Sequence, residues 1–241
     1  PLPIWASPVV ITLAVISILY GVLLAVGQDD IRRLIAFTSV SHFGFIILGI
    51  FAFTTTSMAG STLYMFNHGL STAALFLVTG MMIARRGSAK ISDFGGVQKI
   101  APIMSGIFLI AGLSSLSLPG LAPFVSEFMV LAGTFTRSIP AAAFATLGIV
   151  LAAMYILIMY QRTMTGPLRE DNQGVSELTH REIGALAPAL VLIIGLGFFP
   201  QPLLNVINPA IDDVASHIGK GDPEPKSPVD IGSITIKDGG H

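Results

Sequence analysis

The chain has 241 residues, of which 52% are hydrophobic and only 11% are charged, and its formal net charge is −1. A soluble domain carries about 25% charged residues, so this chain has too few charges to coat a surface that faces water. The charge balance gives no indication of nucleic-acid binding, and the lack of cysteine excludes disulfides, iron–sulfur ligation and zinc–thiolate sites within the chain. The composition indicates a membrane protein surrounded by lipid, with any redox cofactor held elsewhere.

Six hydrophobic stretches follow one another, and a helix needs about 20 apolar residues to cross a bilayer. We expect spans at 8–27, 34–53, 59–84, 102–135, 141–160 and 183–204. Residues 1–205 would then form a transmembrane domain. Residues 206–241 would form an extramembrane tail, rich in Pro, Gly and Asp, with too few apolar residues to fold alone. The first residue is Pro1 and no signal peptide precedes the first span, so we expect a fragment or a processed chain.

The fourth stretch is too long for one straight span, and a hinge of Pro119, Gly120 and Pro123 interrupts it. Proline removes a backbone donor and breaks the hydrogen-bond ladder of a helix. Inside a bilayer the freed carbonyls must be covered by protein or by a wet cavity, and such broken helices often mark ion pathways. The sequence predicts one discontinuous span, and two short helices joined by a tight turn are the alternative.

Basic residues gather in three of the loops. Residues 28–33, 85–101 and 162–183 hold nine Lys and Arg, and by the positive-inside rule such loops lie in the cytoplasm. They share one side of the membrane only if the fourth stretch crosses it once, so the charges favour a single broken span and put the tail on the opposite side. We interpret Arg32 and Arg33 as an interfacial anchor, with an ion pair at a channel mouth as the alternative.

Three strongly polar titratable residues fall well inside the apolar stretches: His42, His68 and Glu127. A charged group at the bilayer centre costs on the order of 2.5–3.5 kcal/mol. A carboxylate there finds partners or takes up a proton, because desolvation disfavours its charged form. Glu127 follows Pro123 by four residues, about one helical turn. We predict proton transfer at Glu127, with a carboxyl that is only a structural partner of a neighbouring helix as the alternative.

Hydroxyl residues lie three and four positions from each histidine, a spacing that shares a helix face. They are Thr38, Ser39, Ser71 and Thr72. A cluster of hydroxyls and imidazoles can hold water and relay protons, and histidine titrates near neutral pH. We predict that His42 and His68 transfer protons and that the four hydroxyls line a channel. Histidines that only pack against their neighbours are the alternative. The sequence has no motif for a metal, a nucleotide or covalent catalysis.

Three motifs are familiar. They are DIRRLIAFTSVSHFG at 30–44, NHGLSTAALFL at 67–77, and LPG at 118–120 followed by FVSEF at 124–128. In this order they resemble the signatures of the antiporter-like subunits of respiratory complex I, the NADH–quinone oxidoreductase, and the likeness covers about residues 8–205. The chain looks most like the M-type subunits, called chain 4 in mitochondria. It has His42, where related subunits tend to have Gln, and it lacks the Lys that L-type and Mrp-type subunits tend to carry near Ser71 and Thr72.

The resemblance implies an all-α polytopic bundle of about six spans with one discontinuous helix. This bundle would be half of an antiporter-like subunit with inverted repeats, comprising the second five-helix repeat and a final helix. By matching motif, Glu127 would be the key acid of the second half-channel, with His42 and His68 as its relays. Arg32 stands where many members have Lys. Because an Arg cannot readily release a proton, we expect no titrating role there.

The resemblance further implies a proton-translocating subunit of complex I that carries out no redox chemistry itself. NADH, FMN, iron–sulfur clusters and quinone would be bound by other subunits. Its partners would be the other membrane subunits, especially neighbouring antiporter-like ones, and lipids, but no nucleic acid. We expect it in the bacterial inner (plasma) membrane as a multi-pass protein rather than in the mitochondrial inner membrane. The alternatives are a subunit of a Mrp-type cation/proton antiporter or of a membrane-bound hydrogenase, and a non-pumping scaffold subunit.

Overall fold

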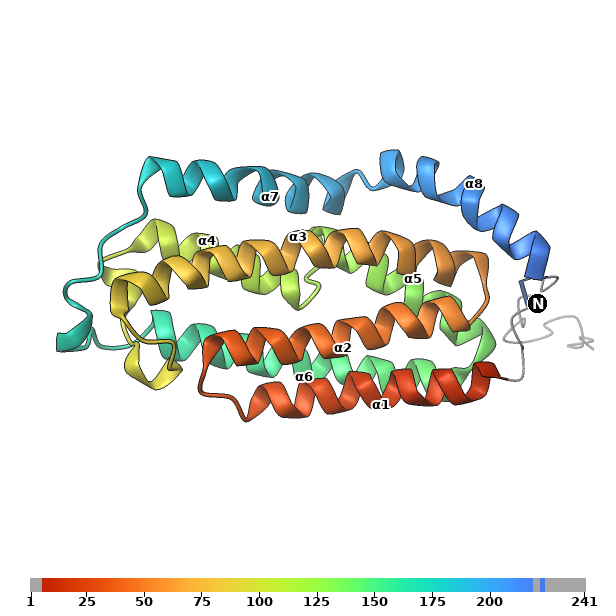
Figure 1. The fold of residues 1–241 in the computed structure, drawn as a ribbon, viewed down its shortest axis with the longest axis horizontal. Helices are drawn as coiled ribbons and strands as arrows, with labels where there is room; N and C mark the ends of the chain where they lie inside the picture. The colour runs from red at the N-terminus through yellow and green to blue at the C-terminus, as the bar shows by residue number, and fades with distance from the viewer. Residues whose placement is uncertain (1–5, 219–221, 224–241) are drawn as a thin grey trace, which may run out of the picture.

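The computed structural model describes residues 6–218 and 222–223. This part of the chain is an elongated helical bundle without a β-strand, and most of its helices run along one common axis (Figure 1). Its α-helices are α1 (Ser7–Val26), α2 (Ile31–Phe51), α3 (Thr55–Arg86), α4 (Pro102–Ser115), α5 (Ala122–Arg137), α6 (Ile139–Met164), α7 (His180–Phe198) and α8 (Gln201–Ile218). The all-α prediction is confirmed.

Local chemistry sets the ends of these helices. The Asp30 carboxylate accepts hydrogen bonds from the backbone N–H groups of Arg32 and Arg33 in the first turn of α2, and such caps satisfy donors that have no partner within the helix. A capping box between Thr54 and Ser57 begins α3, and Gly87, directly after its last residue, has a φ of 74°. A positive φ costs glycine nothing, so the chain turns sharply there.

Five helices, α1, α2, α3, α6 and α7, are long and apolar enough to cross a membrane, and α4 is a shorter apolar helix. Together α4 and α5 make the sixth crossing. At the start of α4, the Glu177 carboxylate accepts from the N–H groups of Ile103 and Met104, and Arg85 near the end of α3 donates to the Glu177 carbonyl. At the end of α5, Arg137 donates to the carbonyl of Ala52, which precedes α3.

The pair α4 and α5 therefore runs beside α3 from its C-terminal to its N-terminal end, with an irregular segment between the two helices (Figure 1). The chain does not reverse at the interruption. The single broken span is confirmed, and the alternative of two short helices in a tight turn is wrong.

The three basic loops meet at one end of the bundle. Ser92 donates from its backbone N–H and its hydroxyl to Asp29, and Arg169 donates to the Ser92 carbonyl over 2.6 Å. Arg85 forms an ion pair with Glu182 at 2.6 Å. These contacts agree with the prediction that the three loops lie on one side of the membrane. The assignment of that side to the cytoplasm stays a prediction.

Asp30 and the exposed Arg32 form an ion pair at 3.2 Å on this end of the bundle. Burial opposes ionisation of Asp30, but hydrogen bonds from the Arg32 side chain and from the backbone N–H groups of Arg33 and Arg32 outweigh it. They hold the pKa of the Asp30 carboxyl below its ordinary value. The exposed position of the Arg32 guanidinium favours the anchor interpretation, because surface ion pairs contribute little energy.

The last predicted span ends earlier than expected, because α7 stops at Phe198 and a second helix, α8, begins after Pro200. Sequence analysis missed α8, since the average composition of the tail hides a periodic apolar face. Its half-buried members are Leu203, Leu204, Ile207, Ile211, Ala215 and Ile218. This face packs on α3. The extramembrane location of residues 206–241 stays a prediction.

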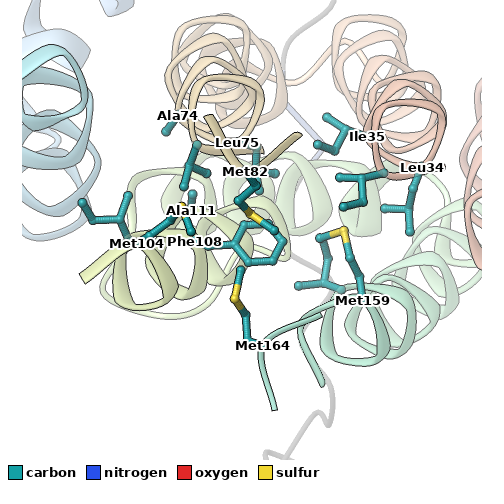
Figure 2. Packing of buried hydrophobic residues seen from close by; sticks show 14 of the residues in the cluster. Leu34, Ile35, Ala74, Leu75, Met82, Met104, Phe108, Ala111, Met159 and Met164 are labelled. Carbon is teal, nitrogen blue, oxygen red and sulfur yellow. The ribbon is translucent and has the colours of Figure 1, made fainter. Parts of the chain in front are cut away.

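A large apolar core fills the part of the bundle toward the basic loops. It joins α2, α3, α4 and α6, and Figure 2 shows Phe108 near the middle of its labelled members. Lipid tails are as apolar as these side chains, so in a bilayer close packing rather than escape from water stabilises such a core. The polar residues described next lie outside this cluster.

Candidate functional site

The irregular segment between α4 and α5 presents a buried acid. Ser117 and Gly120 have positive φ values of 57° and 92°, so the chain leaves helical geometry at both positions. Pro123 then occupies the first turn of α5, where its missing N–H costs nothing. Glu127 follows one turn later and is only 4% exposed. The predicted hinge residues therefore lie at the interruption and in the first turn of α5, the helix that carries Glu127.

Two glycines let α5 approach α3 closely. A Cβ atom at Gly60 would lie 2.9 Å from the backbone N of Val130, and one at Gly133 would lie 2.5 Å from the backbone N of Ser57. Small residues permit this kind of backbone contact between membrane helices. Asn67 of α3 also donates to the Ala122 carbonyl over 2.8 Å. Contacts at the start, the middle and near the end of α5 therefore hold it against α3.

Tyr64 of α3 joins Glu127 to the histidines. Its hydroxyl donates to Glu127 Oε2 over 3.0 Å and lies 2.7 Å from Nδ1 of His42 on α2. The tyrosine is fully buried. Sequence analysis missed this residue, although Tyr64 precedes His68 by four positions and so shares its helix face.

Glu127, Tyr64 and His42 form a series of polar contacts that continues to His68. The ring centroids of His42 and His68 are 4.9 Å apart. The Thr72 hydroxyl lies 3.2 Å from Nδ1 of His68. His42 is 4% exposed and His68 is 8% exposed, so both rings are shielded from the surroundings of the chain. Along α3 the series advances from Tyr64 toward the end of the bundle that carries the basic loops. The structure thus brings together the three residues that the sequence predicts for proton transfer.

Of the four hydroxyl residues predicted to line a channel, Thr72 is the one hydrogen-bonded to a histidine among the described residues. Thr38 and Ser39 both donate to the carbonyl of Ile35 in their own helix. Ser71 is buried, and neither its hydroxyl nor Nε2 of His42 has a hydrogen-bond partner among the described residues. Buried polar atoms normally have partners, so these two atoms have hydrogen-bonding capacity that water can use. The channel-lining role of the four hydroxyl residues stays a prediction.

A cavity of about 260 Å³ borders Glu127 at the interruption. The carboxyl shares the cavity wall with one hydroxyl residue and seven apolar residues. These are Ser117, Leu116, Leu118, Pro119, Phe124, Phe128, Leu131 and Ile149. A water molecule needs roughly 10–15 Å³ of such space and polar partners, and the partners here are the Glu127 carboxyl and the Ser117 hydroxyl. The arrangement offers a buried acid with a hydrogen-bonded tyrosine on one side and a cavity on the other.

The fold and the site define a polytopic membrane protein with a buried acid beside a broken helix. Residues 2–169 match the family model described as "NADH:quinone oxidoreductase/Mrp antiporter, TM". The chain belongs to this family, and the resemblance drawn from its motifs is confirmed.

Several relatives are M-type subunits. The chain is 52% identical over 237 residues to NADH-quinone oxidoreductase subunit M of Mycobacterium tuberculosis, covering 97% of this chain and 43% of that protein. It is 36% identical to subunit M of Rickettsia typhi, covering 85% of this chain and 42% of the relative. It is 34% identical to NADH-ubiquinone oxidoreductase chain 4 of Marchantia polymorpha, covering 91% and 44%. The chain spans less than half the length of these curated relatives.

Solved structures agree on the fold. A chain of respiratory complex I from Thermus thermophilus matches with a TM-score of 0.85 at 30% identity, covering 90% of this chain and 46% of that one. A chain of the Mrp complex from a Dietzia species matches with a TM-score of 0.79 at 21% identity, covering 90% and 48%. At 21% identity, the match to the Mrp complex supports a shared fold only.

Proposed function

We propose that this chain forms part of a proton-translocating membrane subunit of a respiratory NADH–quinone oxidoreductase. The names of the M-type relatives support this assignment, and so does the higher identity to them than to the Mrp complex. The chain carries out no redox chemistry itself. NADH, FMN, iron–sulfur clusters and quinone are held by other subunits. Its partners are the other membrane subunits, above all the neighbouring antiporter-like ones, within the bacterial plasma membrane rather than the mitochondrial inner membrane.

The observation that carries the proposal is the position of Glu127. It is buried beside the helix interruption, borders the cavity, and is hydrogen-bonded to a tyrosine that also contacts His42. A change of charge in a neighbouring subunit alters the balance between the charged and the neutral carboxyl, since a buried charge is weakly screened. The carboxyl then takes up or releases a proton. His42, His68, hydroxyls and water connect this carboxyl with the bulk phase at the end of the bundle that carries the basic loops, and protons are exchanged along this path.

Substitution of Glu127 in the complete complex tests the proposal. Glu127→Gln keeps the volume and removes the titrating group, so we expect quinone reduction by NADH to fall about tenfold or more. Glu127→Asp keeps the titration but withdraws the carboxyl by one methylene, and we expect partial turnover. Glu170→Gln, at an exposed position in the short 3-10 helix Glu170–Asn172, is the control and should be silent. Normal turnover of an assembled Glu127→Gln complex would support the scaffold alternative instead.

A further inference from the structure

We propose that the Tyr64 hydroxyl is the bridge through which a proton passes between His42 and Glu127. This inference rests on the proposed function and assigns a role to a residue that the motifs do not single out. The Tyr64 oxygen lies 2.7 Å from His42 Nδ1 and 3.0 Å from Glu127 Oε2. Both distances are within the range of hydrogen bonds through which protons move.

The transfer needs no charged tyrosine. When His42 is protonated, its Nδ1–H donates to the Tyr64 oxygen, while the Tyr64 O–H donates to the Glu127 carboxylate. The Nδ1–H bond breaks as a new O–H bond forms on Tyr64, and the original Tyr64 proton moves to Oε2. The products are neutral imidazole, neutral phenol and neutral carboxylic acid. Charge and protons balance, and no co-reactant is required.

This exchange leaves the new phenol proton pointing at His42. The hydroxyl must turn back toward Glu127 before a second proton can pass, so each turn of the hydroxyl passes one proton. The ring itself is held in place, because Tyr64 is fully buried and its centroid lies 6.4 Å from that of Phe45. Gly60, one turn earlier on α3, keeps the tyrosine within reach of α5. Only the hydroxyl hydrogen therefore needs to move.

Tyr155 provides a matched control. It lies on α6, is 2% exposed, and its hydroxyl has no hydrogen-bond partner in the part of the chain that the structure describes. Tyr155 interacts electrostatically with Glu127 and Tyr64 but bridges no pair of groups, so it also controls for the loss of a phenol near the carboxyl. Tyr64→Phe and Tyr155→Phe both remove one phenolic oxygen from a buried ring. Only the first change removes an atom that lies between two titratable side chains. A cost that comes merely from losing a buried hydroxyl should affect both variants.

The test measures turnover of the assembled complex in H₂O and in D₂O. We expect Tyr64→Phe to lower NADH–quinone turnover by about tenfold or more and to raise its solvent isotope effect, with Tyr155→Phe unchanged in both. The carboxyl C=O infrared band that Glu127→Gln removes should shift in Tyr64→Phe, because its hydrogen bond is lost. More than half of the normal turnover in Tyr64→Phe, with an unshifted band, would overturn the bridge.

If the Tyr64→Phe variant does not assemble, a fluorinated tyrosine at position 64 provides a second test of the bridge. It retains the ring volume and both hydrogen bonds but has a more acidic hydroxyl. We expect turnover to change by about twofold or more at position 64 and not at position 155. Unchanged turnover at position 64 would again overturn the bridge. Failure of the bridge remains distinct from failure of the proposed function, because only the latter predicts normal turnover in Glu127→Gln.

Discussion

Gly120, in the interruption between α4 and α5, packs directly against Gly197 in the last turn of α7. A Cβ atom on Gly197 would collide with the Gly120 carbonyl and would lie 2.8 Å from the Leu121 Cα. The helix α7 itself ends one residue later, before the break at Pro200. The last turn of α7 therefore covers the interruption, which suits backbone that lipid cannot satisfy.

The first prediction concerns this contact. Gly197→Ala forces the last turn of α7 away from the interruption between α4 and α5, and overpacking of this kind typically costs about 1–3 kcal/mol. We expect a lower unfolding temperature in detergent and reduced turnover, since the displaced segment leads into Glu127. Gly195→Ala is the control, because a Cβ there meets nothing within 4 Å, and alanine favours a helix over glycine by about 1 kcal/mol. Equal stability of the two variants would refute the tight contact.

The second prediction ranks the two histidines. His42 contacts Tyr64 directly, whereas His68 lies one step further along the series. We expect His42→Ala to slow proton pumping more than His68→Ala, because water can more easily replace the outer group. The double variant should be close to His42→Ala alone, since residues in one path are not additive. Pumping at the normal rate by the double variant in reconstituted vesicles would make both histidines packing residues.

The third prediction concerns orientation. The chain has no cysteine, so single cysteines can be labelled without background from it. Gln173→Cys lies on an exposed loop at the basic end, and Thr136→Cys is exposed at the opposite end of the bundle. An impermeant thiol reagent added to intact cells should label position 136 and leave position 173 unlabelled. The reverse pattern would invert the assignment that the positive-inside rule gives.

The sequence allowed the broken span to be predicted closely, because Pro119, Gly120 and Pro123 each carry a local backbone constraint. The buried acid and histidines were also recognisable, since a titratable residue stands out in an apolar stretch. Tyr64 was missed because a neutral phenol does not stand out in an apolar stretch as a carboxyl or an imidazole does. Its role depends on the approach of α5, which Gly60 and Gly133 permit and which no local pattern reveals. Helix α8 was missed because its apolar face is buried only by packing against α3, a contact between segments far apart in the sequence.

Proton uptake measured beside electron transfer in reconstituted vesicles tests the central claim most directly. The complete complex with Glu127→Gln would be compared with the unaltered complex and with Glu170→Gln. If Glu127 carries protons that are coupled to quinone reduction, both proton uptake and NADH–quinone turnover should fall about tenfold or more in the Glu127 variant alone. Unchanged turnover with an unchanged ratio of protons to electrons in an assembled Glu127→Gln complex would contradict the account.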